Sequence, residues 1–75
     1  MRYSAKDIGA IVRKTRKSLG VTQQALALTS GTGTRFIVDL EKGKETCEIG
    51  KALTVLHTLG IKMALTVPSI PRDEK

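Results

Sequence analysis

The stretch Val21–Lys44, VTQQALALTSGTGTRFIVDLEKGK, decides the fold that we expect for this chain. It predicts two short helices joined by a tight glycine turn. Thr22 is placed to cap the first helix, because its hydroxyl can accept a hydrogen bond from a free backbone N–H group. The residues 30–33 interrupt the helix, and Gly31 suits a turn position with positive φ. The second helix is expected over about residues 34–41.

Helical spacing continues on both sides of this stretch. Ser4 and Asp7 resemble a capping box, which predicts that a helix begins there. Apolar residues at helical spacing then form one expected inward face: Ile8, Ile11, Val12, Thr15 and Leu19. A second such set precedes Gly60: Ile49, Ala52, Leu53, Leu56 and Leu59. The sequence therefore predicts an all-α fold of four to five helices, with the four clear ones over about 4–19, 22–29, 34–41 and 48–59.

The period changes after Gly60. Ile61, Met63, Leu65 and Val67 alternate with other residues, which is typical of a β-strand. No second strand is evident, and one strand cannot form a sheet, so we expect it to pair with its copy in a homodimer. The alternative is an extended arm that packs down on its own chain. The expected organisation is a helical domain over 1–60, a dimerisation strand over 61–67 and a flexible tail over 68–75.

The charge of the chain points to a polyanionic partner. The 75 residues form one small domain with 13 Lys+Arg against 7 Asp+Glu, a net charge of +6. Residues 1–44 hold nine of the basic residues and three acids, whereas residues 45–75 hold four of each. The positive field therefore belongs to the half that carries the two short helices, which favours double-stranded DNA over a generic solubilising surface. A short helix presented past a turn fits the DNA major groove.

Several other functions find no support in the sequence. Cys47 and His57 are each the only residue of their type, so we expect no disulfide and no metal site. No catalytic set of nucleophile and base is evident, so we expect neither an enzyme nor a cofactor. No apolar run is long enough to cross a membrane, and the N-terminus lacks the features of a signal peptide, which predicts a cytoplasmic protein. A cationic membrane-surface peptide and a single-strand binder are disfavoured.

The segment Ile8–Gly60 resembles the lambda-repressor-like helix-turn-helix domains of the Xre class. The matching positions are Ile8-Gly9, Arg16, Gly20-Val21-Thr22-Gln23, Leu26-Ala27, Gly31, Ile37, Leu40-Glu41, Gly43-Lys44 and Leu59-Gly60. The strand that follows is similar to that of the HipB-type antitoxins, whose strands pair across a dimer. The resemblance implies a repressor of its own operon that binds a HipA-type kinase toxin. The alternative is a stand-alone Xre-type repressor without a toxin partner.

The chain departs from this class at two turn positions. Thr32 stands where an apolar residue is usual, and Gly33 stands where a polar side chain is usual. The first change is expected to cost some packing, and the second removes a helix cap and one DNA contact. Neither alters the spacing of the two helices, so the fold expected from the resemblance is unchanged.

The start of the second short helix carries the residues that we expect to contact bases. Arg35 can donate two hydrogen bonds to guanine, and Thr34 can contact a thymine methyl group or a base edge. Asp39 lies one turn further on, at a position that contacts bases in this family. Its carboxylate could accept from cytosine, but we favour the alternative that Asp39 pairs with Arg35 and orients it.

A second set of residues is expected to contact phosphates of a pseudo-palindromic operator. Thr22 and Gln23 begin a helix, where free N–H groups attract an anion, and Lys42 and Lys44 follow the next helix. The resemblance also pairs Arg16 with Glu41 in an internal salt bridge, with a phosphate contact as a further role for Arg16. The complete phosphate set is Thr22, Gln23, Arg16, Lys42 and Lys44.

Overall fold

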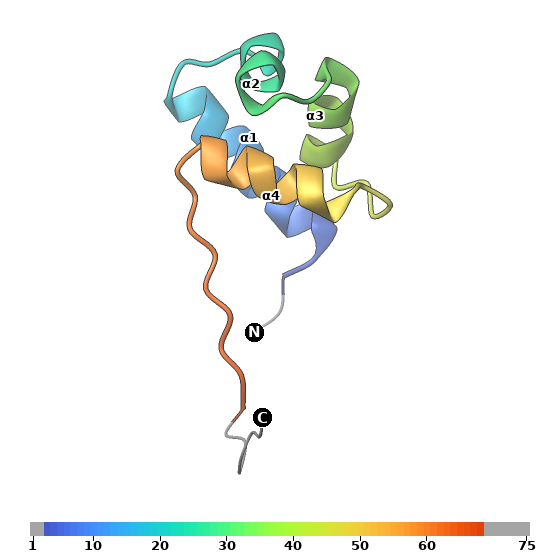
Figure 1. Ribbon diagram of the computed structural model, residues 1–75, viewed down its shortest axis with the longest axis vertical. Helices are drawn as coiled ribbons and strands as arrows, with labels where there is room; N and C mark the ends of the chain where they lie inside the picture. Colours follow the sequence, from blue (N-terminus) through green and yellow to red (C-terminus); the bar gives the residue numbers. More distant parts are fainter. Residues whose placement is uncertain (1–2, 69–75) are drawn as a thin grey trace.

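The computed structural model describes residues 3–68, and this part of the chain contains four helices and no strand. They are α1 (Ala5–Ser18), α2 (Gln23–Ser30), α3 (Thr34–Glu41) and α4 (Ile49–Thr58). Helix α3 packs against α1 and α2, and α4 packs against α2 (Figure 1). The all-α expectation is confirmed for these residues. None of their helices is long and apolar enough to cross a bilayer.

The helix ends follow from local chemistry that the sequence makes visible. The Ser4 hydroxyl accepts from the Asp7 N–H, and the Asp7 carboxylate accepts from the Ser4 N–H, which completes the expected capping box of α1. Thr22 caps α2 by accepting from the Ala25 N–H at 3.0 Å. Gly31 ends α2 with φ of 71°, in the left-handed region where a side chain would be strained.

The core lies where α2, α3 and α4 meet the inner face of α1. Its buried members are Val12, Leu26, Ala27, Ile37, Leu40, Val55 and Leu56. Each fully buried aliphatic side chain of this kind contributes about 1.5–3 kcal/mol relative to an exposed one. Leu26, Ile37 and Leu40 are the large core residues on α2 and α3. These few contacts fix the two short helices against the rest of the domain.

The inner face of α1 differs from the one predicted. Leu19 is 57% exposed and Ile11 is 37% exposed, so the predicted apolar stripe is wrong at both positions. The buried face contains Val12, as predicted, together with Gly9 and Arg16. The reason is a close approach of α3, since a Cβ atom on Gly9 would lie 2.2 Å from the carbonyl oxygen of Leu40. The backbones of α1 and α3 are therefore in direct contact.

The inner face of α4 also differs. Val55 and Leu56 are buried, whereas Ile49 and Leu53, which we expected to face inward, are 75% and 46% exposed. In the first half of α4, Ala52 packs against the core, whereas Ile49 and Leu53 do not. Helical spacing alone did not distinguish these two faces, because both are apolar.

Residues 61–68 leave the helical domain as an extended segment (Figure 1). Ile61 still packs against the core, and its N–H donates to the Leu56 carbonyl at 2.9 Å. Residues 62–68 form no strand ladder with the described part of the chain. The pairing expected for 61–67 needs a second copy, so it stays a prediction. Of the expected tail, residues 69–75 lie outside the described residues.

Candidate nucleic-acid interface

The first residues of α3 are fully accessible. Thr34 is exposed, and the Arg35 side chain is 81% exposed. The N-cap position is Gly33, which supplies no side-chain hydrogen bond to the helix. The first N–H groups of α3 therefore lack the cap that α1 and α2 have, and a polar ligand can take its place.

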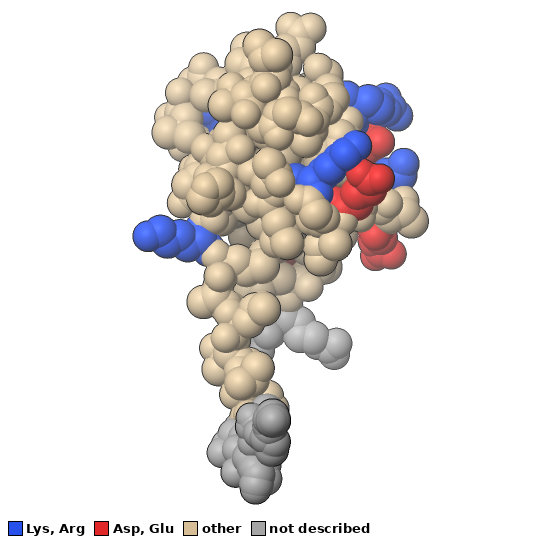
Figure 2. Space-filling view, viewed as in Figure 1, with Lys and Arg blue, Asp and Glu red and all other residues tan. Residues whose placement is uncertain are grey.

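The charged groups on α3 are arranged around Asp39. One carboxylate oxygen of Asp39 lies 3.4 Å from Arg35 Nε, and the other lies 3.6 Å from Lys44 Nζ. The Asp39 side chain is only 18% exposed, so its two cationic partners largely cover it. This geometry favours Asp39 as the group that orients Arg35 over the alternative of a direct base contact. Figure 2 shows charged residues gathered along this edge, beside a mostly uncharged face.

The start of α2 is held close to the end of α3. Thr22 is exposed, and its hydroxyl serves the capping bond described above. The Gln23 amide donates to Glu41 Oε1 at 3.1 Å, so it is turned inward rather than toward a ligand. The group of Gln23 that is available for the expected phosphate contact is therefore its backbone N–H at the helix start, and not its side-chain amide.

Arg16 and Glu41 form the most extensive polar contact of the described residues. Arg16 Nε donates to Glu41 Oε2 at 2.5 Å, and Arg16 Nη2 donates to Oε1 at 3.0 Å. Arg16 Nη1 donates to the Val21 carbonyl at 2.8 Å. The two side chains are 9% and 3% exposed. Such a bidentate pair is rigid as well as strong.

The electrostatics of this pair follow from its surroundings. Burial raises the pKa of Glu41, but hydrogen bonds from Arg16 and Gln23 and the charges of Arg16 and Arg13 outweigh it and lower the pKa. The hydrogen bond to Glu41 raises the pKa of Arg16, against the opposing effect of burial. Each nitrogen of the guanidinium already donates one internal hydrogen bond, and the Arg16 side chain is 9% exposed, which argues against the expected phosphate contact of Arg16.

The turn between α2 and α3 contains a contact that the sequence did not reveal. The buried Ser30 hydroxyl donates to the Leu26 carbonyl at 2.7 Å and lies 2.9 Å from the Thr32 hydroxyl. Thr32, which departs from the class, therefore satisfies a buried polar group instead of packing as an apolar residue. The Thr32 N–H also donates to the Ala27 carbonyl at 2.9 Å. Hydrogen bonds of both the side chains and the backbone therefore hold the turn.

The two lysines after α3 differ in their surroundings. Lys44 is paired with Asp39, as described. Lys42 is exposed and makes no ion pair with the described residues. Residues 3–68 hold no group of three His, Cys, Asp or Glu side chains placed to bind a metal ion.

Replacing Arg16 by methionine tests the buried pair. Arg16→Met leaves the Glu41 carboxylate buried without its cation, so we expect a loss of about 3 kcal/mol in the free energy of unfolding at neutral pH. In the native protein the lowered pKa of Glu41 stabilises the fold above about pH 4.3, and this contribution is lost as the pH falls through the folded-state pKa. The variant loses the two contributions of Arg16, so its Glu41 pKa is expected above the native one, and the difference in the free energy of unfolding between the two proteins is expected to shrink in acid.

Urea denaturation, repeated from neutral pH down through the pKa of Glu41, measures the loss in the free energy of unfolding and its change with pH. The control is Arg35→Met, which removes an exposed arginine and is expected to cost less than about 1 kcal/mol. A loss for Arg16→Met that is equally small, or that does not change with pH, would contradict the role given to the pair.

A known protein is similar to this chain over most of its length. The chain is 53% identical over 62 residues to the uncharacterized HTH-type transcriptional regulator y4mF of Sinorhizobium fredii (strain NBRC 101917 / NGR234). The match covers 83% of this chain and 82% of the relative. No family model matches the chain. The four-helix fold and the exposed start of α3 agree with this similarity, and the chain belongs to the HTH-type transcriptional regulators.

Proposed function

We propose that the protein is a dimeric, sequence-specific transcriptional repressor that places the start of α3 in the DNA major groove. The observation that carries the proposal is the exposed pair Thr34 and Arg35 at a helix end that is otherwise uncapped. Asp39 holds the guanidinium of Arg35 in place, and Lys44 adds a cation beside it. Cations flanking a projecting helix end suit a groove bounded by phosphates.

The Arg16–Glu41–Gln23 contacts support the same proposal. They fix α3 relative to α2, so that the starts of the two helices move as one unit. In such a unit the first N–H groups of α2 contact the phosphate backbone while α3 contacts bases. Thr22, Gln23, Lys42 and Lys44 are the proposed phosphate contacts, and Thr34 and Arg35 are the proposed base contacts.

Replacing Arg35 tests the base contact. Arg35→Ala is expected to lower the preference for operator DNA over random DNA by about 1–3 kcal/mol, because a bidentate arginine–guanine contact is lost. The measurement is a mobility-shift titration on DNA from upstream of the gene and on a random duplex. Lys42→Ala, the phosphate control, is expected to weaken binding to both duplexes alike. Equal losses on both duplexes for Arg35→Ala would argue against a base contact.

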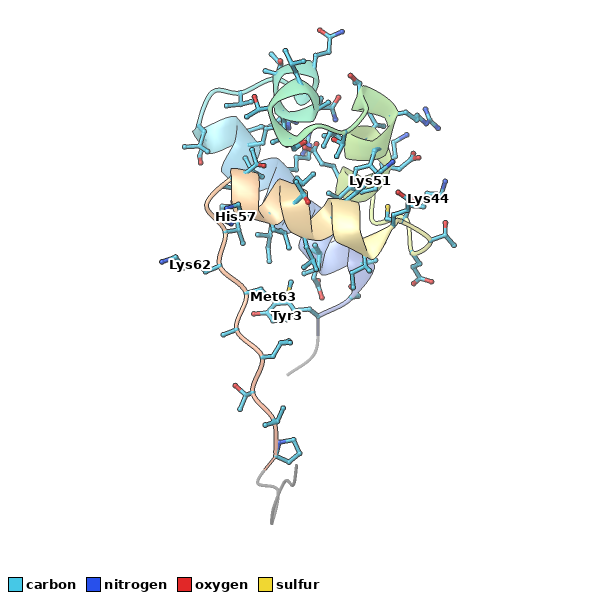
Figure 3. The ribbon with its side chains drawn as sticks, in the orientation of Figure 1. Tyr3, Lys44, Lys51, His57, Lys62 and Met63 are labelled. Atoms are coloured by element: carbon cyan, nitrogen blue, oxygen red, sulfur yellow. The ribbon has the colours of Figure 1, made fainter. Side chains whose placement is uncertain are left out.

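The extended segment 61–68 supports dimerisation. Met63, Leu65 and Val67 are 49%, 86% and 68% exposed, although all three are apolar. Met63 lies beside Tyr3, where the segment and α1 border a hollow of about 510 Å³ (Figure 3). An unpaired apolar strand edge is an association site. A dimer formed by pairing of Ile61, Met63, Leu65 and Val67 would need its two α3 helices about 34 Å apart to bind two half-sites one turn of DNA apart.

A charge on one side of this segment tests the pairing. Leu65→Asp is expected to convert the dimer to a monomer and to weaken operator binding, with the helical circular-dichroism signal unchanged. Thr66→Asp is the matched control, because it adds the same charge on the other side of the alternating strand. Sedimentation velocity measures the oligomeric state. The strand dimer is excluded if both variants dimerise like the native protein.

We further propose that the repressor is the antitoxin of a HipA-type kinase toxin and regulates their shared promoter. The sequence resemblance to HipB-type antitoxins and the extended segment 61–68 support this role. The second candidate is a stand-alone repressor, for which the helical domain and the same DNA contacts suffice.

Co-expression separates these two candidates. We expect the neighbouring gene's product to co-purify with the protein at a fixed ratio and to be inhibited by it as a kinase. The shift assay is then repeated with the complex on the upstream DNA. A neighbour that neither co-purifies nor has kinase activity leaves the stand-alone repressor as the function.

A further inference from the structure

A basic hollow lies on the outer side of α1, away from the start of α3. Its volume is about 460 Å³, and its lining residues are Lys6, Ala10, Arg13, Lys14, Lys17, Glu41 and Lys42. Five of these seven residues are cationic, and the α1 members recur at helical spacing, so they form one stripe along the helix. We call these residues the α1 hollow.

The described part of the chain balances little of the positive charge of the α1 hollow. None of its five cations forms an ion pair with an acid in residues 3–68. Its one acid, Glu41, is 3% exposed at the side chain and already holds Arg16. Cations gathered in this way repel one another, so the hollow has a strong preference for an anionic ligand.

The α1 hollow is continuous with the proposed DNA interface. Lys42 directly follows α3 and lines the hollow. The next residue, Gly43, packs against α1 so closely that a Cβ atom there would lie 2.7 Å from the Lys6 Cα. The segment after α3 and the start of α1 therefore form one surface.

The form of the hollow suits a row of phosphates. Lys6 and Lys17 are separated by about 16 Å along the helix axis, at about 1.5 Å per residue. Successive phosphates of one DNA strand are further apart than their axial rise of about 3.4 Å, so the row of cations can meet several phosphates but fewer than five. An acidic protein fits less well, since protein interfaces are poor in lysine and need an apolar centre. Four of the five cations here are lysines, and Ala10 is the only apolar residue of the lining.

We propose that the α1 hollow is a second phosphate-binding track, which extends the DNA contact beyond the segment after α3. The inference rests on the proposed DNA-binding function. It assigns to Lys6, Arg13, Lys14 and Lys17 a contact with the DNA backbone that carries no sequence information. Its effect is therefore on affinity and salt dependence and not on the choice of operator.

The test is the salt dependence of binding to a random-sequence duplex of about three helical turns. The variant Lys14→Gln/Lys17→Gln removes two exposed cations of the hollow and keeps good helix formers. Each lost phosphate contact lowers the slope of log K against log salt by about 0.9. We expect the slope to fall by about two for each protomer bound, with helical content unchanged.

The matched control is Lys51→Gln, which is compared with the single hollow variant Lys14→Gln so that each protein loses one charge. Lys51 is on α4, outside both the hollow and the pairing segment 61–67 (Figure 3). Its slope is expected to match that of the native protein. An unchanged slope for the hollow variant would overturn the track. Equal falls in slope for the hollow variant and the control would also overturn it, because net charge alone would then explain the result.

The same proteins and DNA duplexes distinguish two further outcomes. If the native protein binds upstream and random DNA equally, the proposed sequence-specific function fails, while the slope comparison still decides the track. If the hollow variant loses binding to polyglutamate and keeps its full slope on DNA, the hollow serves an acidic polypeptide, and the track is overturned.

Discussion

The carboxylate of Glu41 is the contact on which the arrangement of the first three helices depends. It lies at the end of α3 and accepts hydrogen bonds from Arg16 of α1 and from Gln23 at the start of α2. The same arginine donates to the Val21 carbonyl in the connection between α1 and α2. One buried ion pair therefore ties three helices near one point. The opposite end of α3 carries no such tie, which leaves Thr34 and Arg35 exposed.

Two glycines make this arrangement sterically possible. The missing side chain of Gly9 lets α1 touch the last carbonyl groups of α3, and that of Gly43 lets the following segment return to Lys6. Any side chain at either position would displace α3 from α1 and separate Arg16 from Glu41. Close backbone contact and the ion pair thus reinforce each other. They also place the cations of α1 beside the residues that follow α3.

Local chemistry made much of this fold predictable, whereas contacts between helices did not. The cap at Thr22 and the positive φ at Gly31 follow from the residue and its neighbours, so the boundaries of α2 and α3 could be inferred. The Arg16–Glu41 pair came from family resemblance, because no periodicity links residues 25 apart. The inward Gln23 amide depends on tertiary packing that the sequence does not display. For the same reason helical spacing missed Val55.

The exposed apolar residues of α4 and of the segment beyond it point to a partner. Ile49 and Leu53 were expected in the core but lie exposed on α4, and Leu65 and Val67 are exposed beyond it. A small domain buries only part of its apolar surface, and the remainder favours self-association. The cations instead gather on α1 and around α3. Self-association through the apolar residues of α4 and the extended segment would therefore not need the start of α3.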